Sequence, residues 1–125
     1  MAYSLLFSLP GTPALFYGEE IGMGENLALE GRMAVRTPMQ WTSEPGAGFS
    51  TAPKRKLVAP FPSDGYGPDH VNVADQREGD DSLYAFVRSL IYHYRRHPEL
   101  GWGEVSVIDQ SNPAVLVLAC RWDSS

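Results

Sequence analysis

The clearest periodic pattern of apolar positions lies in residues 83–94. Apolar side chains recur there at spacings of three and four residues, at Leu83, Phe86, Val87, Leu90, Ile91 and Tyr94. This spacing puts them on one face of an α-helix, which has to pack against a partner surface. Acidic and hydroxyl residues at 80–82 suit the start of a helix, and the basic residues 95–97 followed by Pro98 suit its end. We therefore predict a helix over residues 83–94.

Other apolar runs are shorter and predict strands. Residues 14–17 are continuously apolar and are bounded by proline and glycine, which is typical of a strand covered on both faces of a parallel sheet. Residues 105–108 and 114–122 are two further strand candidates, joined by a turn-prone Gln-Ser-Asn-Pro sequence. Residues 3–9 fit either the last turns of a helix or a short apolar lead-in. Because two strands alone are marginally stable in water, we expect the last two to open a larger sheet.

Residues 22–79 show no sustained helical or strand period, and Gly, Pro and Asp interrupt them throughout. A compact domain rarely contains so long an irregular segment unless it is a functional loop. We therefore expect a functional loop whose structural support lies partly outside this chain.

Composition narrows the possible partners. The chain has 125 residues, ten basic and fifteen acidic side chains, and a net charge of -5, so nucleic acid is not expected as a partner. The first eighteen residues carry no charge, but Pro10-Gly11 breaks them and no basic residue precedes them, so we expect no membrane role. The single cysteine, Cys120, excludes an internal disulfide, and a reduced thiol fits a cytoplasmic protein.

The residues by themselves do not form a complete active site. Glu19 and Glu20 are adjacent, and neighbours on an extended strand point to opposite faces, so they are not a facing catalytic pair. There is no Gly-x-Ser-x-Gly motif, and His70, His93 and His97 do not make up a metal-ligand spacing pattern. We expect no catalytic residue, no metal site and no cofactor within this chain.

Several long motifs carry a family resemblance. Residues 11–23 (GTPALFYGEEIGM), 36–41 (RTPMQW) and 47–50 (AGFS) closely resemble the α-amylase superfamily of glycoside hydrolases. Residues 64–68 (DGYGP), 70–76 (HVNVADQ) and 98–103 (PELGWG) look like the trehalose synthase, or maltose α-D-glucosyltransferase, branch of that family. Oligo-α-1,6-glucosidases share the RTPMQW block but usually differ in these later segments.

The resemblance implies an α/β fold that is only partly present. Residues 11–23 would be the eighth strand of a TIM-type β/α barrel and the start of the loop after it, and residues 83–94 the eighth helix. The last two strand candidates would be the first strands of a β-sandwich domain. We therefore expect residues 1–98 to be the C-terminal part of the barrel and residues 99–125 the start of the C-terminal β domain. A whole barrel needs about 250 residues.

The same resemblance implies a fragment of an enzyme that interconverts maltose and trehalose by retaining intramolecular glucosyl transfer. In similar enzymes the nucleophilic Asp, the acid Glu and a second Asp lie on strands four, five and seven, upstream of anything that matches Met1. The implied partners are these sugars and the remainder of the parent enzyme, which could also form a homo-oligomer. Two alternatives stay open: a fragment of an oligo-α-glucosidase or α-amylase-type hydrolase, and an inert truncated chain or sugar-binding module.

Four residues are expected to contact substrate. Arg32 and Arg36 lie in the loop that borders the sugar subsites of similar enzymes, and a guanidinium offers a rigid fork of donors for hydroxyls or carboxylates. Glu19 and Tyr17 end the expected strand at the site face, where Glu20 is assigned a structural role. Trp41 and Phe49 are expected in the core. The family often has an acidic residue just before the first arginine, where this chain has Gly31.

Overall fold

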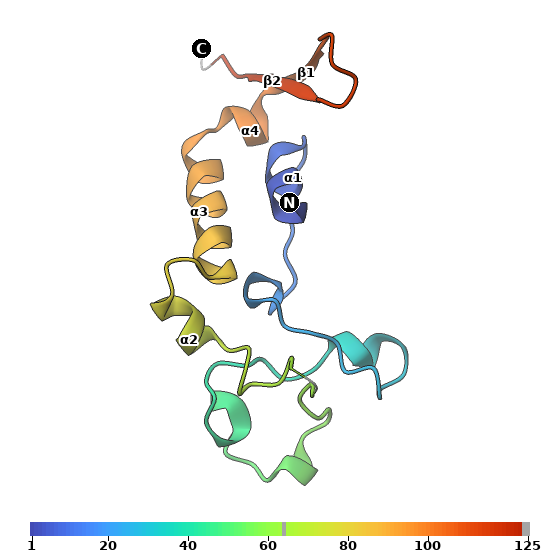
Figure 1. Cartoon of the computed structure of the whole chain (residues 1–125), viewed down its shortest axis with the longest axis vertical. Coiled ribbons are helices and arrows are strands. Elements are labelled where there is room, and N and C mark those ends of the chain that lie inside the picture. The colour runs from blue at the N-terminus through green and yellow to red at the C-terminus, as the bar shows by residue number, and fades with distance from the viewer. Residues whose placement is uncertain (64, 124–125) are drawn as a thin grey trace. The chain divides into compact units, whose positions relative to one another are not determined.

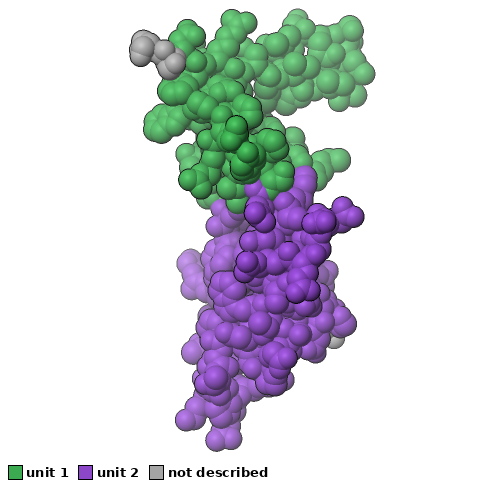
Figure 2. Space-filling view, turned by 90° about the vertical axis from the view of Figure 1, so that its left-hand side faces the viewer, with its two compact units in different colours: residues 1–14, 89–125 green, residues 15–88 purple. Residues whose placement is uncertain are grey.

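The computed structural model describes residues 1–63 and 65–123 (Figure 1). The chain divides into two compact units, which Figure 2 shows in different colours. One unit is Leu15–Arg88, and the other combines Met1–Ala14 with Ser89–Ser125. Each is described separately below.

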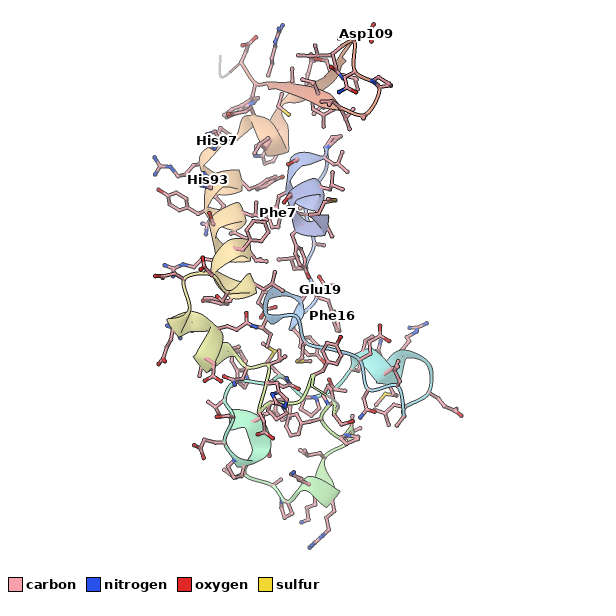
Figure 3. The ribbon with its side chains drawn as sticks, viewed as in Figure 1. Phe7, Phe16, Glu19, His93, His97 and Asp109 are labelled. Carbon is pink, nitrogen blue, oxygen red and sulfur yellow. The ribbon has the colours of Figure 1, made fainter. Side chains whose placement is uncertain are left out.

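The unit that contains both termini is built from helices and one hairpin. Its elements are α1 (Ala2–Ser8), the C-terminal part of α3 (Leu83–Arg96), α4 (Glu99–Trp102), β1 (Glu104–Ile108) and β2 (Val117–Arg121). Of the two alternatives for residues 3–9, the structure has the helix. Phe7 is the buried residue of α1, and its ring meets the ring of Tyr94 edge-on, with centroids 5.9 Å apart (Figure 3). The Tyr94 hydroxyl donates to the carbonyl oxygen of Gly11 at 3.2 Å.

Helix α3 confirms the strongest prediction from the sequence. Its start is fixed by Ser82, whose Oγ accepts a hydrogen bond from the backbone N–H of Ala85 at 3.0 Å. The apolar stripe is present, but within it only Val87 is buried, at 1% exposure, while Phe86 and Ile91 are exposed. Most of the partner surface that this stripe requires is therefore not supplied by the described residues.

The two C-terminal strands pair as predicted. β1 and β2 run antiparallel, with Val105 opposite Cys120 and Ile108 opposite Val117. The second strand begins at Val117, three residues later than predicted. Gln110 donates to the carbonyl of Val115 at 2.8 Å and Asn112 accepts from the N–H of Ala114 at 3.0 Å, so the loop continues through these residues. Half-buried Cys120 is a free cysteine.

The strand predicted at residues 14–17 is wrong for this structure. No strand is assigned there, and Phe16 and Tyr17 are 46% and 43% exposed instead of covered on both faces. A strand is defined by hydrogen bonds to a neighbouring strand, and no described residue pairs with this segment. The apolar run shows that the segment is suited to burial, but the surfaces that would bury it are not among the described residues.

The unit Leu15–Arg88 is mostly loop, as predicted, but it contains one helix that the sequence pattern did not reveal. Four short 3₁₀ turns, η1 to η4, lie at Glu19–Ile21, Gly31–Val35, Pro45–Gly48 and Lys54–Lys56, and α2 spans Val73–Glu78. Six residues are too few to show a helical period. The core of this unit combines the apolar residues Ile21, Ala34, Met39, Ala47, Ala59 and Val87 with the buried polar residues Thr37, Gln40 and Asn72.

Side-chain amides connect the loops of this unit to one another. Gln40 Nε2 donates to the carbonyl oxygens of Tyr66 and Val71, at 3.1 and 2.5 Å. Gln76 Nε2 donates to the carbonyl oxygen of Ile21 at 2.6 Å. Because these loops form no strand pairs, their buried carbonyl groups need such donors.

Asn72 has the same function at the start of α2. Its Oδ1 accepts from the N–H of Asp75 at 2.9 Å, and its Nδ2 donates to the Pro68 carbonyl oxygen at 3.0 Å. The side chain is fully buried, and both of these bonds are partly buried. Among the described helices, none is long and apolar enough to cross a membrane.

Replacing Asn72 with alanine should destabilise the chain by about 2 kcal/mol, because it removes a helix cap and leaves the Pro68 carbonyl oxygen without this buried donor. The free energy of unfolding in urea measures the effect. Asn112→Ala is the matched control, since Asn112 also accepts from a nearby N–H but is exposed, and it should cost well under 1 kcal/mol. Equal losses in the two variants would contradict this account of the buried amide.

Candidate functional site

A cavity of about 580 Å³ in the unit Leu15–Arg88 is lined by two of the four residues predicted to contact substrate. Its wall combines aromatic, charged, hydroxyl and aliphatic side chains: Tyr17, Glu20, Arg36, Thr37, Pro38, Met39, Trp41, Phe49, Ser50, Ala52, Lys56, Leu57, Val58 and Ala59. A second cavity of about 640 Å³ is lined by residues between Ser43 and His70, among them four prolines and three glycines, and contains none of the predicted site residues. The first cavity is therefore the candidate site.

Tyr17 and Arg36 come together at this cavity. The Tyr17 hydroxyl donates to the carbonyl oxygen of Thr37 at 2.9 Å, so it fixes the backbone immediately after Arg36. Arg36 follows directly after η2, and its side chain is exposed. An exposed guanidinium beside a fixed tyrosine can donate to a bound polar molecule.

The prediction that Trp41 and Phe49 are core residues is wrong for this structure. They are 48% and 50% exposed, and both line the cavity. A tight turn between them produces this placement, because Gly46, Ala47 and Gly48 all have left-handed φ values, of 78°, 52° and 66°. The Ala47 carbonyl then accepts from the N–H of Trp41 at 2.9 Å. Trp41 and Phe49 are therefore loop residues that are about half exposed and form part of the cavity wall.

Glycine is required at the last position of that turn. A Cβ on Gly48 would lie 3.0 Å from the Cβ of Trp41, and its φ is one that other residues rarely adopt. The turn residues therefore determine where the Trp41 ring stands in the cavity wall.

The two glutamates lie in η1 and not on a strand, so the argument from strand alternation does not apply to them. Gly18 and Gly22, both with left-handed φ, flank this turn. Glu20 accepts from the N–H of Gly18 at 2.8 Å and Glu19 accepts from the N–H of Phe16 at 3.2 Å (Figure 3). Each carboxylate binds backbone of its own turn. The hydrogen bond from the Gly18 N–H is the kind of contact expected if Glu20 has a structural role.

The structure does not place every predicted residue at the cavity. Glu19 is exposed near Phe16 and does not line it, whereas Glu20 does. Arg32 is an exposed residue of η2 and does not line it either. The cavity thus contains Tyr17 and Arg36 of the four residues expected to contact substrate.

Thr37 is a cavity residue that the sequence gave no reason to select. It is 1% exposed, and its Oγ1 has no hydrogen-bond partner among the described residues. A buried hydroxyl without a partner is uncommon, and a ligand hydroxyl could satisfy it. Nothing in the sequence could have found it, because its burial depends on loops far away along the chain.

The arrangement has the chemistry of a binding surface. Aromatic rings, a guanidinium and a hydroxyl suit a polyhydroxylated ring, which has both apolar faces and polar edges. Within residues 1–63 and 65–123, no cluster of three His, Cys, Asp or Glu side chains could hold a metal ion. Among the described residues that line the cavity, the one carboxylate is that of Glu20, and it accepts from the backbone N–H of Gly18.

Comparison with known proteins identifies the relatives of this chain. It is 47% identical over 114 residues to the trehalose synthase/amylase TreS of Mycobacterium tuberculosis, which covers 90% of this chain and 19% of that protein. The trehalose synthases of Pimelobacter and Thermus thermophilus are 46% and 42% identical, again over 90% of this chain and over 20% and 12% of theirs. The chain therefore spans about a fifth or less of the length of these relatives.

Solved structures show the same fold. The trehalulose synthase MutB from Pseudomonas mesoacidophila matches with a TM-score of 0.76 at 24% identity, over 98% of this chain and 27% of that one. An isomaltulose synthase mutant from Erwinia rhapontici matches with a TM-score of 0.71 at 20% identity, over 97% and 27%. At this identity the likeness concerns the fold alone, which is that of part of an α/β barrel enzyme.

The family model for the alpha amylase catalytic domain matches residues 1–103. This match covers most of the chain and agrees with the resemblance carried by the GTPALFYGEEIGM and RTPMQW motifs. The chain belongs to the α-amylase family, as part of its catalytic domain.

Proposed function

We propose that this chain is a section of an enzyme that interconverts maltose and trehalose by retaining intramolecular glucosyl transfer. The observation that carries the proposal is the identity of 42% to 47%, over 90% of the chain, to bacterial proteins named trehalose synthase. The substrates would be these two disaccharides. The structural relatives add support at the level of fold, and one is a MutB mutant in complex with glucose.

In this proposal residues 1–98 are the C-terminal part of the barrel and residues 99–125 open a C-terminal β domain. The unpaired segment at residues 14–17 would become the eighth strand when the neighbouring strands of the parent are beside it. The exposed stripe of α3 and the exposed residues of the β1–β2 hairpin would likewise be covered by the parent. Exposed Phe86, Ile91 and Val107 are consistent with such missing surfaces.

The chemical step would belong to residues outside this chain. Retaining glycosyl transfer needs two carboxyl groups about 5 Å apart, one as nucleophile and one as acid and base. Transfer to a second sugar in place of water also requires that water be kept out while the glucosyl-enzyme exists. The cavity wall formed by Tyr17, Arg36, Trp41 and Phe49 would supply binding and part of that enclosure.

Among the four residues expected to contact substrate, the support is unequal. For Tyr17 and Arg36 the family resemblance and the cavity agree. For Arg32 and Glu19 the proposed contact rests on the resemblance alone. We assign Arg36 the main polar contact, with Tyr17 holding the backbone next to it through the Thr37 carbonyl.

The products formed from maltose test the proposed reaction. The longer protein that contains this chain should convert maltose mainly to trehalose, with glucose as the minor product. The separate 125-residue chain is the control and should convert nothing, because no facing carboxylate pair lines the cavity among its described residues. Glucose as the sole product would move the assignment to a hydrolase, and trehalose formed by the separate chain would contradict the proposed division of roles.

Substitution of the two arginines tests the proposed wall. In the longer protein, Arg36→Ala should lower kcat/KM for maltose by about 10- to 100-fold, the loss expected for a hydrogen bond to a charged group. Arg32→Ala is the matched control and should have the smaller effect, since Arg32 does not line the cavity. Thermal unfolding of each variant separates a binding effect from a loss of fold. A larger loss in the Arg32 variant would contradict the assignment.

A further inference from the structure

Two exposed histidines lie at the end of α3: His93 is in its last turn, and His97 is the first residue after the helix. His93 and His97 are four residues apart, and their ring centroids are 6.4 Å apart with planes inclined by 33°. Figure 3 shows both on the side of α3 away from Phe7. Both residues are exposed, and the His93 ring meets the Tyr92 ring edge-on, with centroids 5.6 Å apart.

A backbone hydrogen bond orients one of these rings. His97 Nδ1 lies 2.8 Å from the carbonyl oxygen of His93. A carbonyl oxygen accepts, so Nδ1 carries the proton, and Nε2 of the neutral ring keeps its lone pair. Metal-binding histidines are commonly held in this way, with one ring nitrogen donating to a carbonyl group and the other facing the metal.

We propose that His93 and His97 form a two-imidazole chelate for a divalent transition-metal ion such as Zn²⁺, with water as the remaining ligands. His97 follows directly after α3, and its ring lies beside that of His93, so the two rings can share an ion. A zinc ion lies about 2.0–2.1 Å from each imidazole nitrogen. The observed ring separation therefore requires His93 to turn towards His97, which its exposed position allows.

The surroundings indicate which ions would bind. Imidazole suits Zn²⁺, Ni²⁺ and Cu²⁺, whereas Mg²⁺ and Ca²⁺ require oxygen ligands. Arg95 and Arg96 carry positive charge on the same turn, so binding depends on the metal–nitrogen bonds and not on charge attraction. The Arg96 guanidinium lies over the ring of Tyr92, 5.2 Å from its centroid.

This inference revises the expectation that the three histidines lack a ligand spacing. That expectation considered all three together, and His70 lies in a different unit from the other two. At the end of α3, His93 and His97 lie close to each other, and His70 is not part of this pair. The proposal does not depend on the sugar chemistry, and its failure would leave the proposed function unaffected.

Titration of the 125-residue chain with Zn²⁺ in a calorimeter tests the proposal. One ion should bind per chain, and His93→Ala and His97→Ala should each weaken binding at least tenfold. His70→Ala removes an exposed imidazole elsewhere and is the matched control, which should bind as the unsubstituted chain does. No saturable binding to the unsubstituted chain, or an equal loss in all three variants, would overturn the proposal.

A second measurement needs no substitution. In nitrogen-15 spectra of the unsubstituted chain, Zn²⁺ should shift the imidazole nitrogen signals of His93 and His97 and leave those of His70 in place. Shifts at His70 alone, or at none of the three, would overturn the proposal. Far-ultraviolet circular dichroism of the variants checks that α3 keeps its helical content.

Discussion

The loops of the unit Leu15–Arg88 depend on hydrogen bonds from a few buried side-chain amides. Strands would satisfy buried backbone groups through ladders, but this unit has none among its described residues. Gln40 and Gln76 donate to carbonyl groups far from them along the chain, at Val71 and Ile21, and Asn72 donates to the carbonyl of Pro68, four residues before it. An unpaired buried carbonyl group costs about 1–3 kcal/mol, so each amide fixes the position of a loop that would otherwise be unstable.

These hydrogen bonds from buried amides also position residues of the cavity wall. Gln40 lies between Met39 and Trp41, which both line the cavity, and its carbonyl group also accepts from the N–H of Val73 at 3.0 Å. The left-handed turn around Ala47 then directs Trp41 and Phe49 to the same space. In the proposed enzyme, loops would thus form the binding surface for a sugar ring, while the catalytic groups would come from elsewhere. This separation of binding loops from catalytic groups would account for a cavity whose described residues include binding groups but no facing pair of carboxylates.

The sequence predicted the elements whose signals lie within a few neighbouring residues. Helix α3 and the β1–β2 hairpin followed from periodicity and from a capping serine, because those signals lie within a few residues of one another. The strand at residues 14–17 was wrong because strand formation needs a partner, and α2 was missed because it is only one and a half turns long. Thr37 and Glu20 were missed as cavity residues, and Trp41 was misplaced in the core, since exposure depends on distant loops. Tyr17 and Arg36 were found through family resemblance and not through periodicity.

Hydrogen exchange of the 125-residue chain tests most directly whether these loops are held as described. The amide protons of Trp41, Val73 and Ala74 donate to the carbonyl groups of Ala47, Gln40 and Trp41, at 2.9, 3.0 and 3.0 Å. If the buried amides fix this unit, these three protons should exchange as slowly as those in the middle of α3. Exchange at the rate of an unstructured peptide, with α3 still protected, would show that the cavity wall does not form in this chain and would contradict the account.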